Sequence, residues 1–240
     1  MGIEIMHSAR RKAQGLKNKR ILITAGPTWV PIDKVRVISN IASGQTGILL
    51  ATVAKKLGAR VTLFLGPVSA NGLDKSIRIR RFRFFNELKE KLTKELRCSR
   101  YDAIIHSAAV ADFKPASLVK GKIKSCKNYV LRLKLLPKII QDIRRLAPGA
   151  KLVMFKLEPG VSDAALVQKA KSAQQKARAD VMVANRINPY RAFIIDRLGN
   201  AVSVRSKKEL AKKLIISLGI VPCGRKFRDS PLRGQSLIKL

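Results

Sequence analysis

The stretch ILITAGPTWVPIDKVRVISNIASGQTG, residues 21–47, decides the fold of this chain. It begins with an apolar, β-branched run, breaks at Gly26, crosses a polar segment and ends in Ser43-Gly44-x-x-Gly47. A strand, a glycine-containing loop and a helix start are the parts of a phosphate site, because glycine admits the ligand and the first helical N–H groups are unpaired. The spacing matches neither GxGxxG nor a P-loop. Spacing alone therefore leaves two readings open, a phosphate loop and an ordinary strand-to-helix connection.

The elements that follow this stretch complete a strand–helix–strand unit. Residues 21–25 are apolar without alternation, which predicts a central strand in a parallel sheet. Residues 47–57 form an amphipathic run that ends at Gly58, as a helix would. Residues 60–65 supply the next apolar strand. The unit is typical of Rossmann-type folds.

Downstream, the same two patterns continue to residue 218. Residues 77–82 alternate arginine with apolar residues, as a half-exposed edge strand would. We therefore predict an α/β fold, a Rossmann-like and mostly parallel sheet with helices on both faces, plus a small antiparallel hairpin element. The remaining expected elements are strands at 101–109, 129–135, 151–157 and 180–185, helices at 86–96 (capped by Asn86), 137–146, 162–179 (capped by Ser162) and 207–218, and a hairpin of 192–196 with 201–205.

The charge of the chain is strongly positive. Fifty lysine and arginine residues against fifteen aspartate and glutamate residues give a formal net charge of +35 in 240 residues. Such a surface attracts polyanions nonspecifically and in a salt-dependent way. Because the basic residues are not confined to one tail or helix, we favour a generally basic surface over a nucleic-acid site. The aromatic content of 5% is too low for a row of base-stacking side chains.

The remaining composition bounds the class of protein and its location. Three scattered cysteines without CxxC spacing argue against a disulfide framework or a zinc site, and two histidines exclude a His-rich metal centre. No apolar run is long enough to cross a bilayer, and the start lacks a secretory signal, so we expect a cytoplasmic protein without a membrane partner. We expect a basic arm at 1–18, one domain at 19–221 and a disordered basic tail at 222–240.

The motifs TAGPT, PID, VR-ISN, SG, SAAVADFKP, KIK, MFKLE and ADVMVAN occur in this order between residues 19 and 218. In this order they resemble the phosphopantothenate–cysteine ligases of coenzyme A biosynthesis, of bacterial type. The resemblance implies that the 4′-phosphopantothenate carboxylate attacks the α-phosphate of CTP, giving an acyl-cytidylate and pyrophosphate. The amine of cysteine then displaces CMP. It also implies Mg²⁺ on the triphosphate and a homodimer with sites built partly across the interface. Because only a basic arm precedes residue 19, we expect a free-standing ligase.

The resemblance implies catalytic roles for three residues. Asn40 matches the asparagine that contacts the acyl group, and Arg36 matches the arginine needed after activation. Lys122 matches the lysine of a loop that closes over the triphosphate and excludes water. Outside these motifs, the same residue types would be a turn residue and two solvated surface cations.

The resemblance also implies the binding residues. Phe113 and Phe155 would cradle the base, although plain core packing explains such residues equally well. The nucleotide is expected at Gly26, Thr28, Ser43, Gly44, Gly47, Asp112, Phe113, Lys122, Phe155, Lys156 and Glu158, the substrate at Arg36, Asn40, Ala108, Ala109 and Asn185, and the metal at Asp112. The chain departs from the family pattern at Ala42, Gln45, Ser125, Pro159 and Arg186, which leaves the phosphate-loop geometry and the choice of CTP over ATP open.

Two other classes of protein compete with the ligase. A Rossmann-type NAD(P)-binding oxidoreductase would need GxGxxG and an acidic residue at the end of the second strand. That strand ends in Leu65-Gly66 instead. A nucleic-acid-binding protein would need its basic residues clustered on one face. The ligase alone accounts for the order of the motifs.

Overall fold

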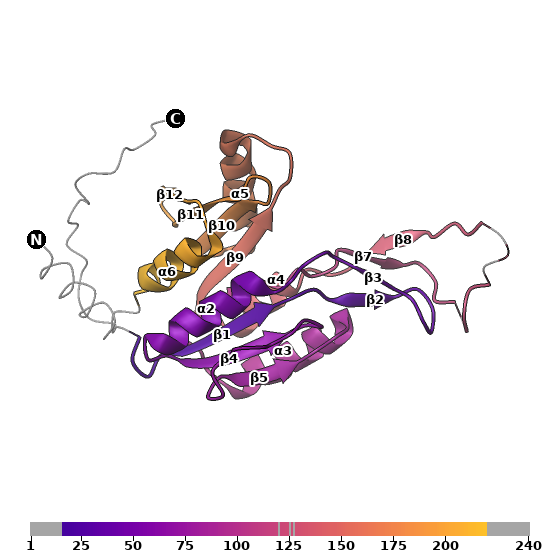
Figure 1. Cartoon of the computed structure of the whole chain (residues 1–240), viewed down its shortest axis with the longest axis horizontal. Coiled ribbons are helices and arrows are strands. Elements are labelled where there is room, and N and C mark those ends of the chain that lie inside the picture. Colours follow the sequence, from indigo (N-terminus) through magenta and orange to yellow (C-terminus); the bar gives the residue numbers. More distant parts are fainter. Residues whose placement is uncertain (1–15, 120, 125, 127, 220–240) are drawn as a thin grey trace, which may run out of the picture.

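One mixed sheet of eight strands forms the body of the molecule (Figure 1). The computed structural model describes residues 16–119, 121–124, 126 and 128–219. The expected tail at 222–240 and most of the expected arm at 1–18 lie outside these residues, and Leu16 is already buried in the core. In spatial order the strands are β12 (Ala201–Val204), β11 (Arg191–Ile195), β10 (Val181–Arg186), β9 (Lys151–Leu157), β6 (Ala103–His106), β1 (Arg20–Ala25), β4 (Arg60–Leu65) and β5 (Arg78–Arg81).

The centre of the sheet is parallel, as the sequence predicts. β1 pairs in parallel with β4 on one side and β6 on the other, and five of its six residues are buried. From β1 the chain runs outward through β4 to β5, and then returns to β6 and continues to β9 and β10 on the other side. The order of the strands therefore reverses between β1 and β6. In open α/β sheets, ligands bind at the carboxyl ends of the strands at such a switch point.

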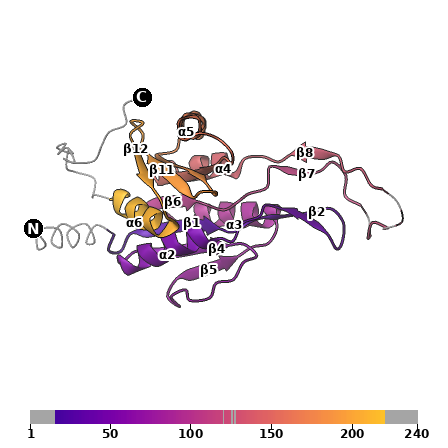
Figure 2. The same cartoon turned by 45° about the horizontal axis from the view of Figure 1, so that its top comes forward.

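Helices cover both faces of the sheet, which confirms the predicted class. α2 (Gln45–Lys56) and α6 (Lys207–Ser217) pack on the face that carries Ile21 and Ile23. α3 (Phe85–Cys98) and α4 (Ile139–Leu146) pack on the face that carries Leu22, and α5 (Asp163–Ala177) covers Met182 of β10 (Figures 1 and 2). Within the described residues, no helix combines the length and the apolar character that a bilayer crossing requires.

Two short antiparallel ribbons leave the body of the molecule together as an arm (Figures 1 and 2). One pairs β2 (Trp29–Pro31) with β3 (Val37–Ser39), and the other pairs β7 (Phe113–Pro115) with β8 (Leu133–Leu135). The strand predicted at 129–135 is therefore wrong in extent, and all three residues of β8 are exposed. Its alternation does not come from burial within this chain.

The ends of the predicted helices are partly corrected. α3 begins at Phe85, so Asn86 lies inside the helix and does not cap it. The Glu87 carboxylate instead accepts hydrogen bonds from the two backbone N–H groups that precede the helix. The predicted Ser162 cap of α5 is confirmed, because its hydroxyl accepts the N–H of Ala165 at 3.3 Å.

Candidate functional site

Glycines bring the loops at the carboxyl ends of β1 and β4 close together. Gly26 and Gly44 both have positive φ angles, 81° and 69°, which favour glycine. A Cβ on Gly44 would lie 2.9 Å from Val68 Cγ2 and 3.3 Å from the backbone nitrogen of Gly26. Gly44, just before α2, therefore packs against both the loop after β1 and the loop after β4, more closely than a side chain would allow.

Gly47 sets the distance between α2 and β1. It is buried in the first turn of α2, and an added Cβ would lie 2.4 Å from the Cβ of Ala25 and 2.9 Å from Ser107 Oγ. Because its backbone packs on the strand, Gly47 would influence a bound nucleotide by setting the position of α2 and not by contacting the nucleotide itself. Ser43 precedes this turn and its hydroxyl accepts the N–H of Gln45 at 3.4 Å.

Replacing Gly47 with alanine is expected to destabilise the protein by about 1–3 kcal/mol, because overpacking forces α2 away from β1. Urea denaturation of wild type and variant measures this loss. Gly149 is the matched control, since a Cβ there would meet nothing within 4 Å and its φ is not positive. Equal stabilities of Gly47→Ala and Gly149→Ala would contradict the packing role.

Asn40 joins the arm to the loop that follows β6. It comes directly after β3, and its side-chain Nδ2 donates to the backbone oxygens of Ala109 (3.2 Å) and Val110 (3.1 Å). The buried Thr28 supports the same loop, because its N–H donates to the Ala109 oxygen and its Oγ1 accepts the N–H of Ala111 at 2.9 Å. The predicted residues Asn40, Thr28 and Ala109 thus meet at the switch point.

His106 is a polar residue at this edge that the motifs do not single out. Its Nδ1 lies 2.9 Å from Thr24 Oγ1, and the same hydroxyl accepts the N–H of Ala108 at 3.2 Å. Burial lowers the pKa of His106 from 6.5 to about 4, so the imidazole is neutral at neutral pH. A polar residue that ends the apolar run Ala-Ile-Ile was the signal in the sequence.

The His106 pKa predicts how stability changes with pH. Because the folded-state pKa lies below the unfolded value, the unfolded chain binds the extra proton first as the pH falls. The free energy of unfolding is expected to drop by on the order of 2 kcal/mol between about pH 6.5 and pH 4 from this group. Denaturation at several pH values should show this slope in the wild type and not in His106→Gln. Identical slopes would rule it out.

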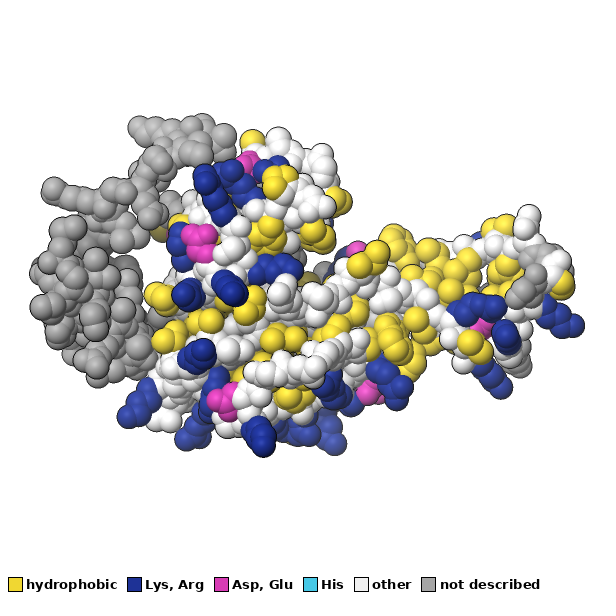
Figure 3. Space-filling view, viewed as in Figure 1, with side chains coloured by type: hydrophobic (Ala, Val, Ile, Leu, Met, Phe, Trp, Pro, Cys, Tyr) yellow, Lys and Arg dark blue, Asp and Glu magenta, His cyan; other side chains and the backbone are white. Residues whose placement is uncertain are grey.

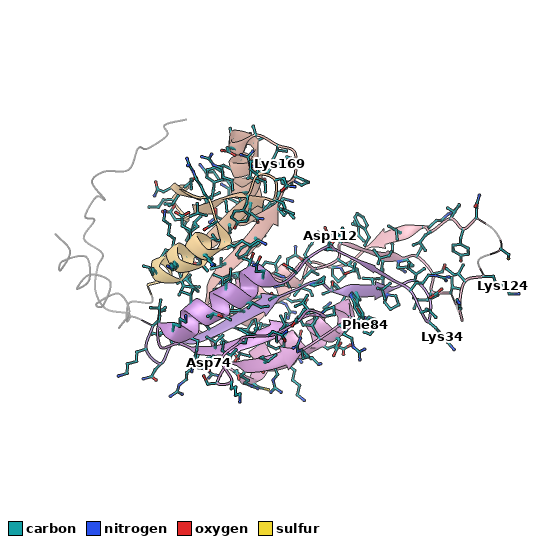
Figure 4. The ribbon with its side chains drawn as sticks, viewed as in Figure 1. Lys34, Asp74, Phe84, Asp112, Lys124 and Lys169 are labelled. Atoms are coloured by element: carbon teal, nitrogen blue, oxygen red, sulfur yellow. The ribbon has the colours of Figure 1, made fainter. Side chains whose placement is uncertain are left out.

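Asp112 and Phe113 lie where the arm leaves the body (Figure 4). Asp112 forms an ion pair with Lys138, and its carboxylate is more than half exposed. Among the described residues there is no group of three His, Cys, Asp or Glu side chains placed to hold a metal ion. Mg²⁺ is commonly held by one or two carboxylates together with substrate phosphates. Asp112 could supply one such carboxylate, but the described residues around it form no ready metal cage. Phe113 is 47% exposed on β7.

A second set of predicted residues meets at the carboxyl ends of β9 and β10. The Asn185 backbone oxygen accepts the N–H of Glu158 at 3.1 Å. Glu158 pairs with Lys156 at 2.9 Å and with Lys169 of α5 at 3.0 Å, and hydrogen bonds from these two lysines, that of Lys156 first, hold the pKa of this carboxyl below its usual value. Phe155 is partly buried against the core, as the packing interpretation expects.

Two of the three predicted cationic residues, Arg36 and Lys122, lie on the arm and not at the switch point. Arg36 Nη1 donates to the backbone oxygen of Ile123, the residue after Lys122, at 3.2 Å. Figure 4 labels Lys34 and Lys124, which are close in sequence to Arg36 and Lys122, at the end of the arm. Lys169 lies on the body of the molecule, and Asp112 lies between that body and the end of the arm. A single chain therefore places the residues around Asn40 and those around Glu158 along one edge of the sheet. It keeps Arg36 and Lys122 apart from both groups.

The sheet order, the glycine loops at the switch point and the polar residues at the carboxyl ends define a Rossmann-like α/β domain with its candidate site at that edge. The chain belongs to the family described as the DNA/pantothenate metabolism flavoprotein C-terminal domain, whose model matches residues 16–218. The resemblance drawn from the motifs is thereby confirmed at the level of the family.

Known proteins support this membership. The coenzyme A biosynthesis bifunctional protein CoaBC of Thermococcus kodakarensis is 34% identical over 220 residues, which cover 88% of this chain and 54% of that protein. The chain thus spans about half the length of the curated relatives it matches. The DNA/pantothenate metabolism flavoprotein from Streptococcus pneumoniae superposes with a TM-score of 0.75 at 26% identity, covering 83% of this chain and 98% of that one. The C-terminal domain of a CoaBC protein gives a TM-score of 0.72 at 26% identity over 86% and 97% of the two chains.

Proposed function

We propose that this chain is a cytoplasmic ligase of coenzyme A biosynthesis that joins 4′-phosphopantothenate to cysteine. The reaction consumes CTP and yields 4′-phosphopantothenoylcysteine, CMP and pyrophosphate. The observation that carries the proposal is the family match over residues 16–218 together with Asn40 held at the switch point of the sheet. The family match also weighs against the oxidoreductase and the nucleic-acid-binding alternatives.

The chemistry requires an activated carboxyl and a place for its oxygen. The substrate carboxylate forms a bond to the α-phosphorus and pyrophosphate leaves. The amine of cysteine then attacks the acyl carbon, loses a proton, and CMP leaves. Both Nδ2 hydrogens of Asn40 are already directed at backbone oxygens, so the acyl oxygen would take the place of one of them. In this role, Asn40 stabilises the oxygen on which negative charge develops.

The nucleotide would lie along the carboxyl edge, between the glycine loops and the ends of β9 and β10. Gly26 and Gly44 let the backbone approach a phosphate, and Asn185 and Lys156 border the edge at the far side. Mg²⁺ on the triphosphate would neutralise phosphate charge, with Asp112 as the carboxylate at hand. Binding of that ion would have to displace Lys138 from Asp112.

The active form is a homodimer in this proposal. The arm carries Arg36 and Lys122 away from the chain's own switch point, so a second copy is needed to complete the site. The arm also exposes apolar side chains, which Figure 3 shows gathered along it (yellow). Those with large exposed surface include Val35, Val37, Phe113, Leu118, Tyr129, Val130, Leu133 and Leu135. Contact with a partner would bury them and would explain the alternation at 129–135, most of whose apolar residues stay exposed in the part of the chain that the structure describes.

The test supplies folded protein with Mg²⁺, 4′-phosphopantothenate, cysteine and either CTP or ATP. The proposal expects pyrophosphate release that depends on both the nucleotide and phosphopantothenate, and an amide product whose formation depends on cysteine. CTP is expected to give the larger kcat/KM. Folded protein that forms no amide with either nucleotide would reject the function, and a preference for ATP would reject the nucleotide assignment.

A further inference from the structure

A buried carboxylate lies in the turn between β2 and β3. The Asp33 side chain is 0% exposed, and it accepts four hydrogen bonds. Oδ1 accepts the backbone N–H groups of Val35 at 2.8 Å and Arg36 at 2.7 Å. Oδ2 accepts from Arg36 Nη1 at 2.6 Å and from the N–H of Ile123 at 3.0 Å. One carboxylate thus holds its own turn and a segment about ninety residues further along the chain.

The segment that contains Lys122 is laid along this turn by further hydrogen bonds. The N–H of Lys34 donates to the Gly121 oxygen at 3.1 Å, and the N–H of Val119 donates to the Ile32 oxygen at 3.4 Å. Arg36 Nη1 bridges the Asp33 carboxylate and the Ile123 oxygen. The guanidinium and the backbone N–H of Ile123 are therefore fixed to the same side chain, and Gly121, on the other side of Lys122, is held by the backbone of the same turn.

The charge of Asp33 is needed for this arrangement. Every group that faces the carboxylate is a donor, and backbone hydrogen bonds, that of Ile123 first, hold its pKa well below the usual range. It stays ionised at any pH at which the protein works. An asparagine of the same shape has one acceptor oxygen, and its NH₂ group would face N–H donors, which leaves buried polar groups unpaired.

We propose that Asp33 is a positioning residue that fixes Arg36 and Lys122 relative to each other, so that the guanidinium reaches the acyl substrate while the lysine meets the phosphates of the nucleotide. Within the described residues, Arg36 and Lys122 share no hydrogen bond with each other, and Asp33 is the side chain that bonds both Arg36 and the residue after Lys122. The assignment rests on the proposed ligase function. It adds a residue whose carboxylate touches neither substrate nor nucleotide.

The first test measures the link itself and needs no activity. In Asp33→Asn, amide hydrogen exchange of residues 121–123 is expected to be at least about tenfold faster than in the wild type, because the N–H of Ile123 loses its charged acceptor. Asp74→Asn is the matched control. Asp74 also accepts from a backbone N–H and a side chain in an exposed turn, and it lies at the opposite end of the molecule from Lys34 (Figure 4). Exchange in Asp33→Asn no faster than in this control would overturn the proposal.

The second test separates positioning from general loss of structure. Asp33→Asn is expected to raise the KM for the nucleotide by about tenfold or more and to leave the KM for cysteine unchanged, with partial recovery in Asp33→Glu. Ile123→Pro removes one N–H donor and keeps the carboxylate, and the same split in KM is expected from it. Unchanged nucleotide KM in both variants, or an equal rise in both KM values, would overturn the proposal. A wild type without ligase activity would instead reject the proposed function, whatever the exchange data show.

Discussion

Replacing Asn40 with aspartate is expected to lower kcat/KM for ligation by about a thousandfold, the scale seen when a donor to a developing oxyanion is lost. In the structure, Nδ2 of Asn40 donates to the oxygens of Ala109 (3.2 Å) and Val110 (3.1 Å). A carboxylate at this position has no hydrogen to offer and would face two carbonyl oxygens. It would also place a negative charge beside an anionic substrate. Steady-state rates and pyrophosphate release measure the loss.

The control for this substitution makes the same change, from amide to carboxylate, at a position away from the site. Asn71→Asp makes the same change in an exposed loop between β4 and β5, and it is expected to retain wild-type turnover. Circular dichroism of Asn40→Asp should match that of the wild type. Wild-type turnover in a folded Asn40→Asp would remove Asn40 from the mechanism.

Replacing Lys122 with glutamine is expected to lower kcat/KM by about a hundredfold or more, because the triphosphate would lose a positive charge that the proposed site places against it. Lys75→Gln, in the exposed turn before β5, changes the same charge outside the site and is expected to leave the rate unchanged. An equal effect of the two substitutions would mean that Lys122 contributes only to the general positive potential.

A mixture of two single variants, Lys122→Gln and Asn40→Asp, tests whether each site is built from two chains. Co-expressed in equal amounts, the two inactive variants form mixed dimers, each with one site that has both native residues. About a quarter of all sites would then be intact, and about a quarter of the wild-type activity is expected. No recovery in mixed dimers would mean that the arm serves the cleft of its own chain.

The body of the fold is predictable from the sequence for local reasons. β1 is apolar without alternation because β4 and β6 flank it and helices cover both of its faces. α2 is amphipathic because one side packs on that strand. In both elements, burial within the chain determines where the apolar residues lie, so the apolar pattern predicts the element.

The arm was predicted poorly because its pattern has another origin. The alternating run at 129–135 forms a strand only over Leu133–Leu135, and no intrachain core selects its apolar residues. The Asp33 link was missed for a related reason. Ile123, which donates to Asp33, is ninety residues away in the sequence, and no local sequence pattern predicts a contact over that separation. For Asn40, the motif singles out the residue, while its position beside the loop after β6 and its two backbone acceptors needed coordinates.

The most direct measurement of the proposed reaction follows the carboxyl oxygen of the substrate. Phosphopantothenate with both carboxylate oxygens replaced by a heavy isotope is incubated with wild-type protein, CTP, Mg²⁺ and cysteine, and the masses of the products are measured by mass spectrometry. An acyl-cytidylate route predicts one labelled oxygen in CMP for each molecule of 4′-phosphopantothenoylcysteine formed. Amide product with unlabelled CMP, or folded protein that forms no amide, would contradict it.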